Sequence, residues 1–301
     1  MRRIIVAIVF CVIIVAEIVV SSLFGGDVVI KSADERINNN ENIIVASYNT
    51  AAPWGNVLEG TGSSKRATLF AQQINDQLPD VLGVQEINSD WVKKMEKFLP
   101  QYNYYGVKRG GDANEKQSEM NGIFYLKEKF DLVDSGTFWI SDTPEVESKY
   151  KDAGCYRICS YVILKNKTTG KAFAHFNTHF DNTSVEAQEL GGKLVGDKSK
   201  EITLKYGDIP IVITGDFNQY SDAPGCMALE EKGYKNANKI SENYDNMVTY
   251  NGWTNETVGR PIDFIFVNNA FSVNSYDVVT DTGAKTNVSD HYMIKASLNF
   301  S

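Results

Sequence analysis

Short apolar runs separated by polar turns recur along most of the chain. Runs of this length, bounded by Gly, Asn, Asp and Ser, are typical of strands that are buried in a sheet. We therefore expect strands at Ile43–Ser47, Val81–Gln85, Gly122–Leu126, Ile158–Lys165, Ala172–Thr178, Ile209–Thr214, Ile262–Val267 and Tyr292–Phe300.

Two further stretches have sequence signals of helices, one in its apolar spacing and one in its capping residues. Between Ala67 and Leu78 the apolar residues recur at i, i+3, i+4 and i+7. Ser63 or Ser64 can cap this helix, and Pro79 ends it. Residues 183–186, Thr-x-x-Glu, have the form of a capping box and predict a second helix that begins near Thr183. Strands that alternate with helices and hairpin-like pairs predict an α+β fold in which sheets pack face to face with helices outside.

The first residues are a different kind of sequence. Two arginines precede a run from Ile4 to Val20 that is apolar except for one Glu. As a helix this run would span ~25 Å, close to the ~30 Å of a bilayer core, and its basic flank would send the rest of the chain across the membrane. We predict an exported protein, extracellular or anchored to the outer face of the cytoplasmic membrane. Residues 1–22 are then a cleaved signal peptide or a membrane anchor, 23–42 a linker, and 43–301 one domain.

Composition narrows the function only a little. Of the 301 residues 43% are hydrophobic and 23% charged, which is ordinary for a globular protein, and the formal net charge is -8. A chain this acidic gains little from counterion release on nucleic acid unless its basic residues gather on one face. Nucleic acid is therefore not a favoured partner, whereas an enzyme that meets phosphate through a metal ion is not excluded.

Polar side chains stand at the ends of the apolar runs. Because strand ends in a sandwich cluster in space, we expect these side chains to share one edge and to form a site. His175 serves as a control, because it lies ~13 Å from His179 on one strand and cannot bind the same metal ion. We interpret His175 as structural. The strand-end residues are Asn49, Glu86, His179, Asp181, Asp216, Asn218, Asp290 and His291.

Taken in order, these motifs resemble the endonuclease/exonuclease/phosphatase superfamily, whose familiar member is deoxyribonuclease I. The resemblance covers about Asn42 to Phe300, and Gly136–Trp139 followed by Pro144 is similar to the exported bacterial branch. It implies a four-layered α/β/β/α sandwich, with two mixed β-sheets flanked by helices and the site in a cleft at one end. The motifs are Ser47–Asn49, Val84–Glu86, Asn177–Asp181, Gly215–Asn218, Ile262–Phe266 and Ser289–His291.

The resemblance also implies a role for each residue. Glu86 is the principal metal ligand, with Asn49 beside it and Asp290 in the same metal site. Carboxylate and amide oxygens of this kind suit Mg²⁺. Asp216 orients or deprotonates the attacking water, and Asn218 holds water or phosphate nearby.

The histidines fall into two pairs. His291 contacts the phosphate, and Asp263 fixes its tautomer and favours the imidazolium. His179 and Glu119 match a second such pair. Arg157 matches a position that contacts phosphate, with a surface or interface ion pair as the alternative. Two departures from the family pattern concern the choice of substrate: Asn182, where related bacterial sequences have His, and Gln117, where deoxyribonuclease-type members have Tyr.

These features predict a monomeric, exported hydrolase of phosphate esters that depends on Mg²⁺, with Mn²⁺ or Ca²⁺ as alternative ions. A phosphate-ester substrate and, through residues 4–20, the membrane are its expected partners.

An extracellular endonuclease would need a basic groove, for which Lys108 and Arg109 offer little. A sphingomyelinase-like lipid phosphodiesterase would need exposed aromatic residues, and a sugar or inositol phosphatase also stays open. A tethered binding protein without catalysis should lack a metal-binding or water-activating residue, and none is missing. The aromatic residues considered for a lipid enzyme are Trp54, Tyr104, Tyr105 and Trp253.

Overall fold

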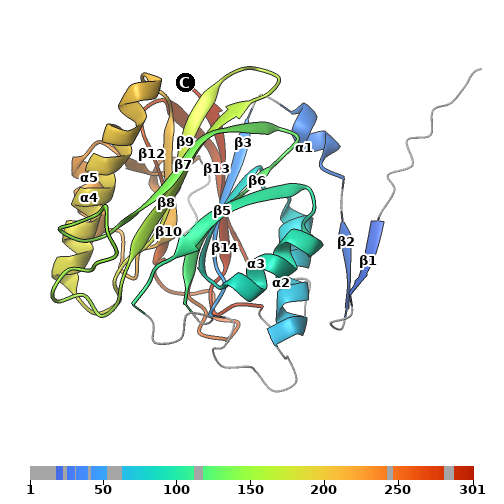
Figure 1. Ribbon diagram of the computed structural model, residues 1–301, viewed down its shortest axis with the longest axis horizontal. Coiled ribbons are helices and arrows are strands. Elements are labelled where there is room, and N and C mark those ends of the chain that lie inside the picture. The colour runs from blue at the N-terminus through green and yellow to red at the C-terminus, as the bar shows by residue number, and fades with distance from the viewer. Residues whose placement is uncertain are drawn as a thin grey trace, which may run out of the picture.

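The described residues of the computed structural model form two six-stranded mixed β-sheets that pack face to face (Figure 1). Its described parts are residues 18–22, 26–30, 32–39, 42–52, 63–111, 118–242, 247–280 and 288–301.

The first sheet has the strand order β13-β14-β3-β4-β6-β5. Its strands β3 and β4 run parallel, and its other neighbours are antiparallel. The strand bounds are β3 (Ile43–Asn49), β4 (Val81–Ile87), β5 (Tyr102–Lys108), β6 (Met120–Leu126), β13 (Phe271–Val279) and β14 (Met293–Phe300).

The second sheet has the order β11-β12-β10-β9-β8-β7 and repeats this arrangement. Its strands β9 and β10 are parallel, and the rest are antiparallel. Each sheet therefore has one parallel pair near its centre, and the carboxyl ends of a parallel pair lie at the same edge. The bounds are β7 (Phe130–Trp139), β8 (Ile158–Asn166), β9 (Ala172–His179), β10 (Ile211–Asp216), β11 (Lys235–Asn236) and β12 (Asp263–Val267).

Helices cover the outer face of each sheet, which completes the four layers (Figure 1). Helices α2 (Ser63–Gln77) and α3 (Ser89–Phe98) lie on the first sheet, and α4 (Val185–Thr203) and α5 (Pro224–Glu231) on the second. Three apolar clusters fill the spaces between the layers, and the middle one lies between the sheets. The predicted α/β/β/α sandwich is confirmed. Two short helices, η1 (Leu204–Tyr206) and α6 (Ala237–Ile240), follow α4 and β11.

All the predicted strands are present, with bounds shifted by one or two residues. The start of α4 differs from the prediction. Its cap is Ser184, whose side chain accepts a hydrogen bond from Ala187 N, and not Thr183. The Thr183 hydroxyl donates instead to Asp181 Oδ1 at 2.8 Å, so it is not free to cap the helix.

The N-terminal segment contains regular structure where we predicted the end of an apolar helix and a linker. Strands β1 (Ile18–Ser22) and β2 (Gly26–Ile30) pair as an antiparallel hairpin, since β-branched residues fit strands well. Helix α1 (Asp34–Asn38) is tied to the domain by an ion pair of 2.8 Å between Arg36 and Asp80. Within the described residues no helix is long and apolar enough to cross a membrane. Residues 1–17, with most of the apolar run, lie outside the described part, and the predicted domain boundaries stay predictions.

A buried asparagine joins the two sheets. Asn177 of β9 donates from Nδ2 to the carbonyls of Val84 (2.8 Å) and Gly122 (2.9 Å) in the first sheet. Its Oδ1 accepts from Gln85 Nε2 at 2.7 Å and from Thr214 Oγ1 at 3.1 Å. An Asn amide has two donor hydrogens and an oxygen with two lone pairs, so this side chain is fully satisfied. The space it occupies exists because β4 has no side chain at position 83, where a Cβ would lie 2.5 Å from Asn177 Oδ1.

Candidate active site

The carboxyl ends of the two parallel strand pairs meet at one edge of the sandwich. Asn49 ends β3 beside Gln85, and Asp216 ends β10 beside His179. The side chain of Asn49 crosses from one sheet to the other, because its Nδ2 donates to Glu86 Oε1 (3.1 Å) and to Asp216 Oδ2 (3.0 Å). The expected clustering of strand ends is therefore confirmed.

The backbone is strained at two residues near this edge, Glu86 and Asn218. Glu86 and Asn218 have φ of 59° and 51°, in the left-handed region that costs a residue other than glycine about 1–3 kcal/mol. At Glu86 the strain coincides with a register shift between Val84 and Ile87, which is the signature of a β-bulge. A bulge re-aims a side chain, and here it accompanies the turn of Glu86 into the site.

One cluster, which we name the His291 cluster, consists of His291, Asp263 and Asp216. His291 Nδ1 lies 2.8 Å from Asp263 Oδ2, and His291 Nε2 lies 3.7 Å from Asp216 Oδ2. Burial alone would lower the pKa of His291, but the charges of Asp263 and Asp216 outweigh it and raise the pKa well above the usual range. Burial, followed by the charge of Asp263, raises the pKa of Asp216. The geometry favours an imidazolium at His291.

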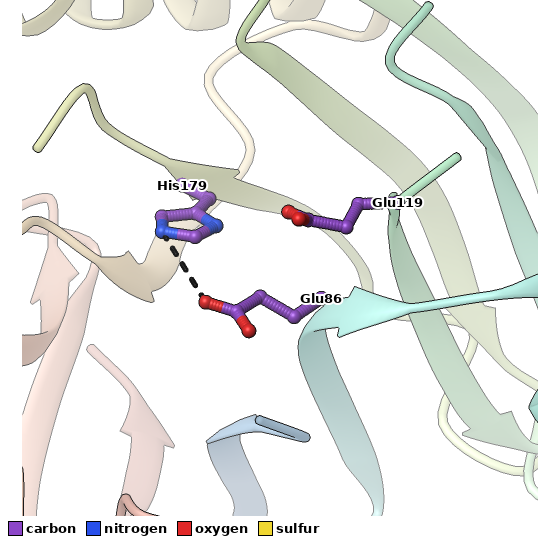
Figure 2. A group of neighbouring side chains, drawn as sticks. All are labelled: Glu86, Glu119 and His179. Carbon is purple, nitrogen blue, oxygen red and sulfur yellow. Dashed lines mark ion pairs between the residues drawn. The ribbon is translucent and has the colours of Figure 1, made fainter. Parts of the chain in front are cut away.

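The second, which we name the His179 cluster, consists of His179, Glu86 and Glu119 (Figure 2). His179 Nε2 lies 4.0 Å from Glu86 Oε1, and the other ring nitrogen faces Glu119 in the figure. Asn218 Nδ2 lies 2.9 Å from Nε2, and because an amide nitrogen donates, Nε2 accepts. Burial and the positive charges of Arg157 and Arg109 lower the pKa of His179 well below its usual value. His179 is therefore a neutral imidazole.

Two arginines flank the His179 cluster. Arg109 Nη1 lies 2.6 Å from Glu119 Oε2, so this basic group is paired. Arg157 immediately precedes β8 and is buried, with Nη2 donating to Asn182 Oδ1 at 3.3 Å. The ion pair that we considered as the alternative role is present, because Arg157 Nε lies 4.0 Å from Asp181 Oδ2, but it lies inside the protein and not at the surface. Asn182, the departure from the family pattern, is thus a direct neighbour of Arg157.

The donor set fits a divalent cation. The two clusters contain four carboxylates, and Asp290 adds a fifth, with Oδ1 3.9 Å from His291 Nε2. Asp263 Oδ1 and Asp290 Oδ1 are buried and have no hydrogen-bond partner among the described residues. In each cluster the candidate ligand atoms lie within 4.8 Å of one another, and in the His291 cluster Asp263 already forms a close ion pair with the histidine. Hard oxygen donors at such spacing can hold a cation.

Some residues at the site were not predicted from the sequence. The ring of Tyr250, 48% exposed, lies edge-on to His291 with centroids 5.1 Å apart. Arg66 is buried at the start of α2, and its position four residues before Phe70, on the apolar face of the helix, was the signal that could have revealed it. Nothing in the sequence points to Tyr250.

The control histidine lies within the polar interior. His175 is buried, and its Nε2 lies 2.7 Å from Thr214 Oγ1. Burial lowers its pKa to about 3, as expected for a structural residue. Gln117 and Trp54, which bear on the choice of substrate, lie outside the described residues.

Comparison with known proteins identifies the family to which this fold and site belong. A model of the Endonuclease/Exonuclease/phosphatase family matches residues 46–291, most of the chain. The chain therefore belongs to the endonuclease/exonuclease/phosphatase family, and this membership supports a phosphoesterase activity. Enzymes of the family use divalent metals, in keeping with the donor set.

Several solved structures are similar over nearly their whole length. The mannosyl-6-phosphatase Bt3783 of Bacteroides thetaiotaomicron is 34% identical, with a TM-score of 0.79, and the match covers 86% of this chain and 100% of that one. A family protein from Bacteroides vulgatus is 29% identical, with a TM-score of 0.73 and coverage of 86% and 99%. The uncharacterized protein R895 of Acanthamoeba polyphaga mimivirus is 21% identical over 231 residues. That match spans 67% of this chain but only 32% of the viral protein.

Proposed function

We propose that this protein is an exported, Mg²⁺-dependent phosphatase that hydrolyses small phosphate monoesters, with sugar phosphates as its substrate class. The observation that carries the proposal is the meeting of a neutral His179 and a protonated His291 around Asp216, whose Oδ2 lies 3.5 Å and 3.7 Å from their Nε2 atoms. The similarity to a protein named as a mannosyl-6-phosphatase supports the substrate class.

The roles of the residues follow from their contacts. Glu86 and Asn49 would hold the metal, with Asp290 beside them. A bound divalent cation neutralises charge on the phosphate and lowers the pKa of water. Asp216 is held by Asn49 and by the Asn218 main-chain N–H, at 2.8 Å, and receives the proton of the attacking water. The water oxygen bonds to phosphorus as the bond to the sugar oxygen breaks, and that oxygen regains a proton from solvent.

The remaining polar groups match a phosphate with two charges. His291 as imidazolium and Arg157 as guanidinium would bind its peripheral oxygens. Arg157 Nε is buried, forms an ion pair with Asp181 Oδ2 at 4.0 Å, and makes no hydrogen bond to a described residue, so its N–H can donate to a phosphate oxygen. Guanidinium groups bind phosphate oxygens through pairs of N–H groups. Asn182, which accepts from Arg157, would set the orientation of this fork.

The alternative substrates have less support. An endonuclease would use a basic groove, but Arg109 is already paired with Glu119. A lipid phosphodiesterase would present aromatic residues to the membrane, but Tyr104 packs on Phe124, with ring centroids 4.6 Å apart. Trp253 likewise faces the guanidinium of Arg66.

Export is supported by the apolar run that follows two arginines at the start of the chain. Cell fractionation of a C-terminally tagged full chain tests it, and finding all of the protein in the cytosol would contradict export.

A substrate panel tests the activity. Mannose 6-phosphate, bis-p-nitrophenyl phosphate, DNA and sphingomyelin vesicles are incubated with the protein in Mg²⁺, Mn²⁺, Ca²⁺ or EDTA. We expect phosphate release from the monoester to be fastest, to stop in EDTA, and to be abolished by Glu86→Gln. Glu189→Gln, a change on α4 of a half-buried carboxylate that pairs with Lys193, is the matched control and should leave the rate unchanged. Turnover that survives both EDTA and Glu86→Gln would overturn the proposal, and faster diester cleavage would replace the substrate class.

A further inference from the structure

Arg66 occupies an unusual place for a charged side chain. It is 3% exposed, and its guanidinium carbon lies 4.5 Å from the centroid of the Trp91 ring and 5.4 Å from that of Trp253. A planar guanidinium can stack on such rings, which a lysine ammonium cannot do. Burial of a charge is costly unless its donors are satisfied, so its hydrogen bonds indicate what the residue does.

The hydrogen bonds that Arg66 makes to described residues all end on main-chain carbonyls. Nη1 donates to Thr50 O and to Val288 O, the latter at 3.2 Å. Nη2 donates to Ala51 O at 2.9 Å and to Ala52 O at 3.2 Å. One side chain therefore holds three successive carbonyls after β3 and one carbonyl of the segment that precedes His291.

These three residues form a strained turn. Ala51 and Ala52 have φ of 56° and 23°, which residues other than glycine adopt only when their surroundings impose it. Such a turn needs an external restraint, and the fork of Arg66 provides one. Ser289 adds a second tie between the same two segments, because its hydroxyl donates to Asn49 O at 2.6 Å.

The turn is directed at the proposed metal ligands. Ala51 N donates to Asn49 Oδ1 at 2.9 Å, and Ala52 N donates to Glu86 Oε2 at 2.8 Å. The N–H groups thus orient the oxygens of both side chains, while the carbonyls of the same residues are held by Arg66. Hydrogen bonds that orient metal ligands are as much a part of a metal site as the ligands themselves.

We propose that Arg66 is a positioning residue for the metal site: by holding the turn at residues 50–52, it fixes the orientation of Asn49 and Glu86. The inference rests on the proposed function, since it takes these two residues to be metal ligands. Its effect on the site would be indirect, through the main-chain carbonyls of residues 50–52.

Mn²⁺ binding to the full chain, measured by calorimetry, tests the inference without turnover. We expect Arg66→Lys, which keeps the charge but loses the fork and the stacking, to weaken Mn²⁺ binding by about tenfold to a hundredfold, the usual effect of removing such a partner. Arg36→Lys is the matched control, because Arg36 pairs with Asp80 at the other end of β4, ~20 Å from Glu86. It should leave Mn²⁺ affinity unchanged.

A rescue separates positioning from general damage to the fold. Glycine adopts positive φ without strain, so Ala51→Gly in the Arg66→Lys background should restore part of the Mn²⁺ affinity. A merely structural role of Arg66 would not predict such a recovery. Hydrogen exchange at residues 49–52, faster in Arg66→Lys than in the parent protein, provides a readout in the absence of metal.

The outcomes are distinguishable. Equal Mn²⁺ affinity in the parent protein and Arg66→Lys overturns the inference and leaves the phosphatase proposal intact. A parent protein that binds no divalent ion overturns the proposed function itself. If Arg66→Lys does not fold, Ala51→Gly and Ala52→Gly in the parent background replace it. Unchanged exchange at residues 49–52 in both glycine variants would then count against the strained turn.

Discussion

The His291 cluster and the His179 cluster contain the same kinds of residue but hold their histidines in opposite states. In the first, a carboxylate of Asp263 bonds the ring directly at 2.8 Å and favours the cation. In the second, the neutral amide of Asn218 bonds the ring at 2.9 Å. Arg157 and Arg109 further disfavour a positive charge there. The difference shows that contact geometry, rather than the count of acidic residues nearby, sets the protonation of a buried histidine.

The largest expected effect comes from the residue that both histidines share. Asp216→Asn keeps the shape of the side chain but removes its charge and its capacity to take a proton, so we expect kcat to fall by about a thousandfold. Steady-state hydrolysis of mannose 6-phosphate measures this. Asp197→Asn, an exposed change on α4, is the control. Activity within tenfold of the parent protein would mean that the clusters do not act through Asp216.

Asp263→Asn should make His291 resemble His179. With its directly bonded carboxylate removed, the pKa of His291 falls, and NMR titration of the metal-free protein would follow the change. A histidine whose pKa is raised by folding stabilises the protein below its unfolded pKa, and this stabilisation is lost as pH rises through the folded pKa. The variant should therefore lose most stability at acidic to neutral pH, with a roughly hundredfold loss of kcat at pH 7. An unchanged pKa would contradict the assigned pairing.

Tyr250→Leu tests the smallest difference between the clusters. The ring of Tyr250 packs on His291, and as an exposed ring it can contact the sugar of the substrate. We expect KM for mannose 6-phosphate to rise several-fold, on the order of 1 kcal/mol, with kcat little changed. Tyr220→Leu is the control, because this exposed ring packs on Arg260 and not on either histidine. An equal effect of the two variants would exclude a specific role for Tyr250.

The strands that could be predicted from the sequence are the buried ones. Their continuous apolar runs exist because both faces are covered, which is true of β3, β4, β9 and β10. Strands β5, β7 and β13 were not predicted, and all three lie at sheet edges, where exposed polar residues interrupt the pattern. Apolar periodicity is weak at an edge for this physical reason.

The residues of the site likewise fall into those that could be predicted from the sequence and those that could not. Residues such as Glu86 and Asp216 end buried strands, so the strand pattern alone brings them to one edge. The pairing of His291 with Asp263 was implied by the family motifs and is confirmed at 2.8 Å. Tyr250 reaches the site from a loop, and Arg66 from a helix, and no local pattern specifies where those segments pack. The opposite charge states of the two histidines could be inferred only from distances in the structure, because a sequence motif does not give distances.

The link made by Asn177 has a consequence for recombining this domain with its relatives. The chain first passes from one sheet to the other at residues 127–129, the turn between β6 and β7, and it returns to the first sheet with β13 and β14. The turn is a possible crossover point for chimeras. Such a chimera would take Gln85 and the gap at position 83 from one parent and Asn177 from the other. Since Gln85 adjoins Glu86 and Asn177 is two residues from His179, a mismatched pair of parents would misalign β4 with β9 and with them the two site residues that these strands carry. Parents should therefore be chosen by their compatibility at this buried contact before any resemblance of their surfaces.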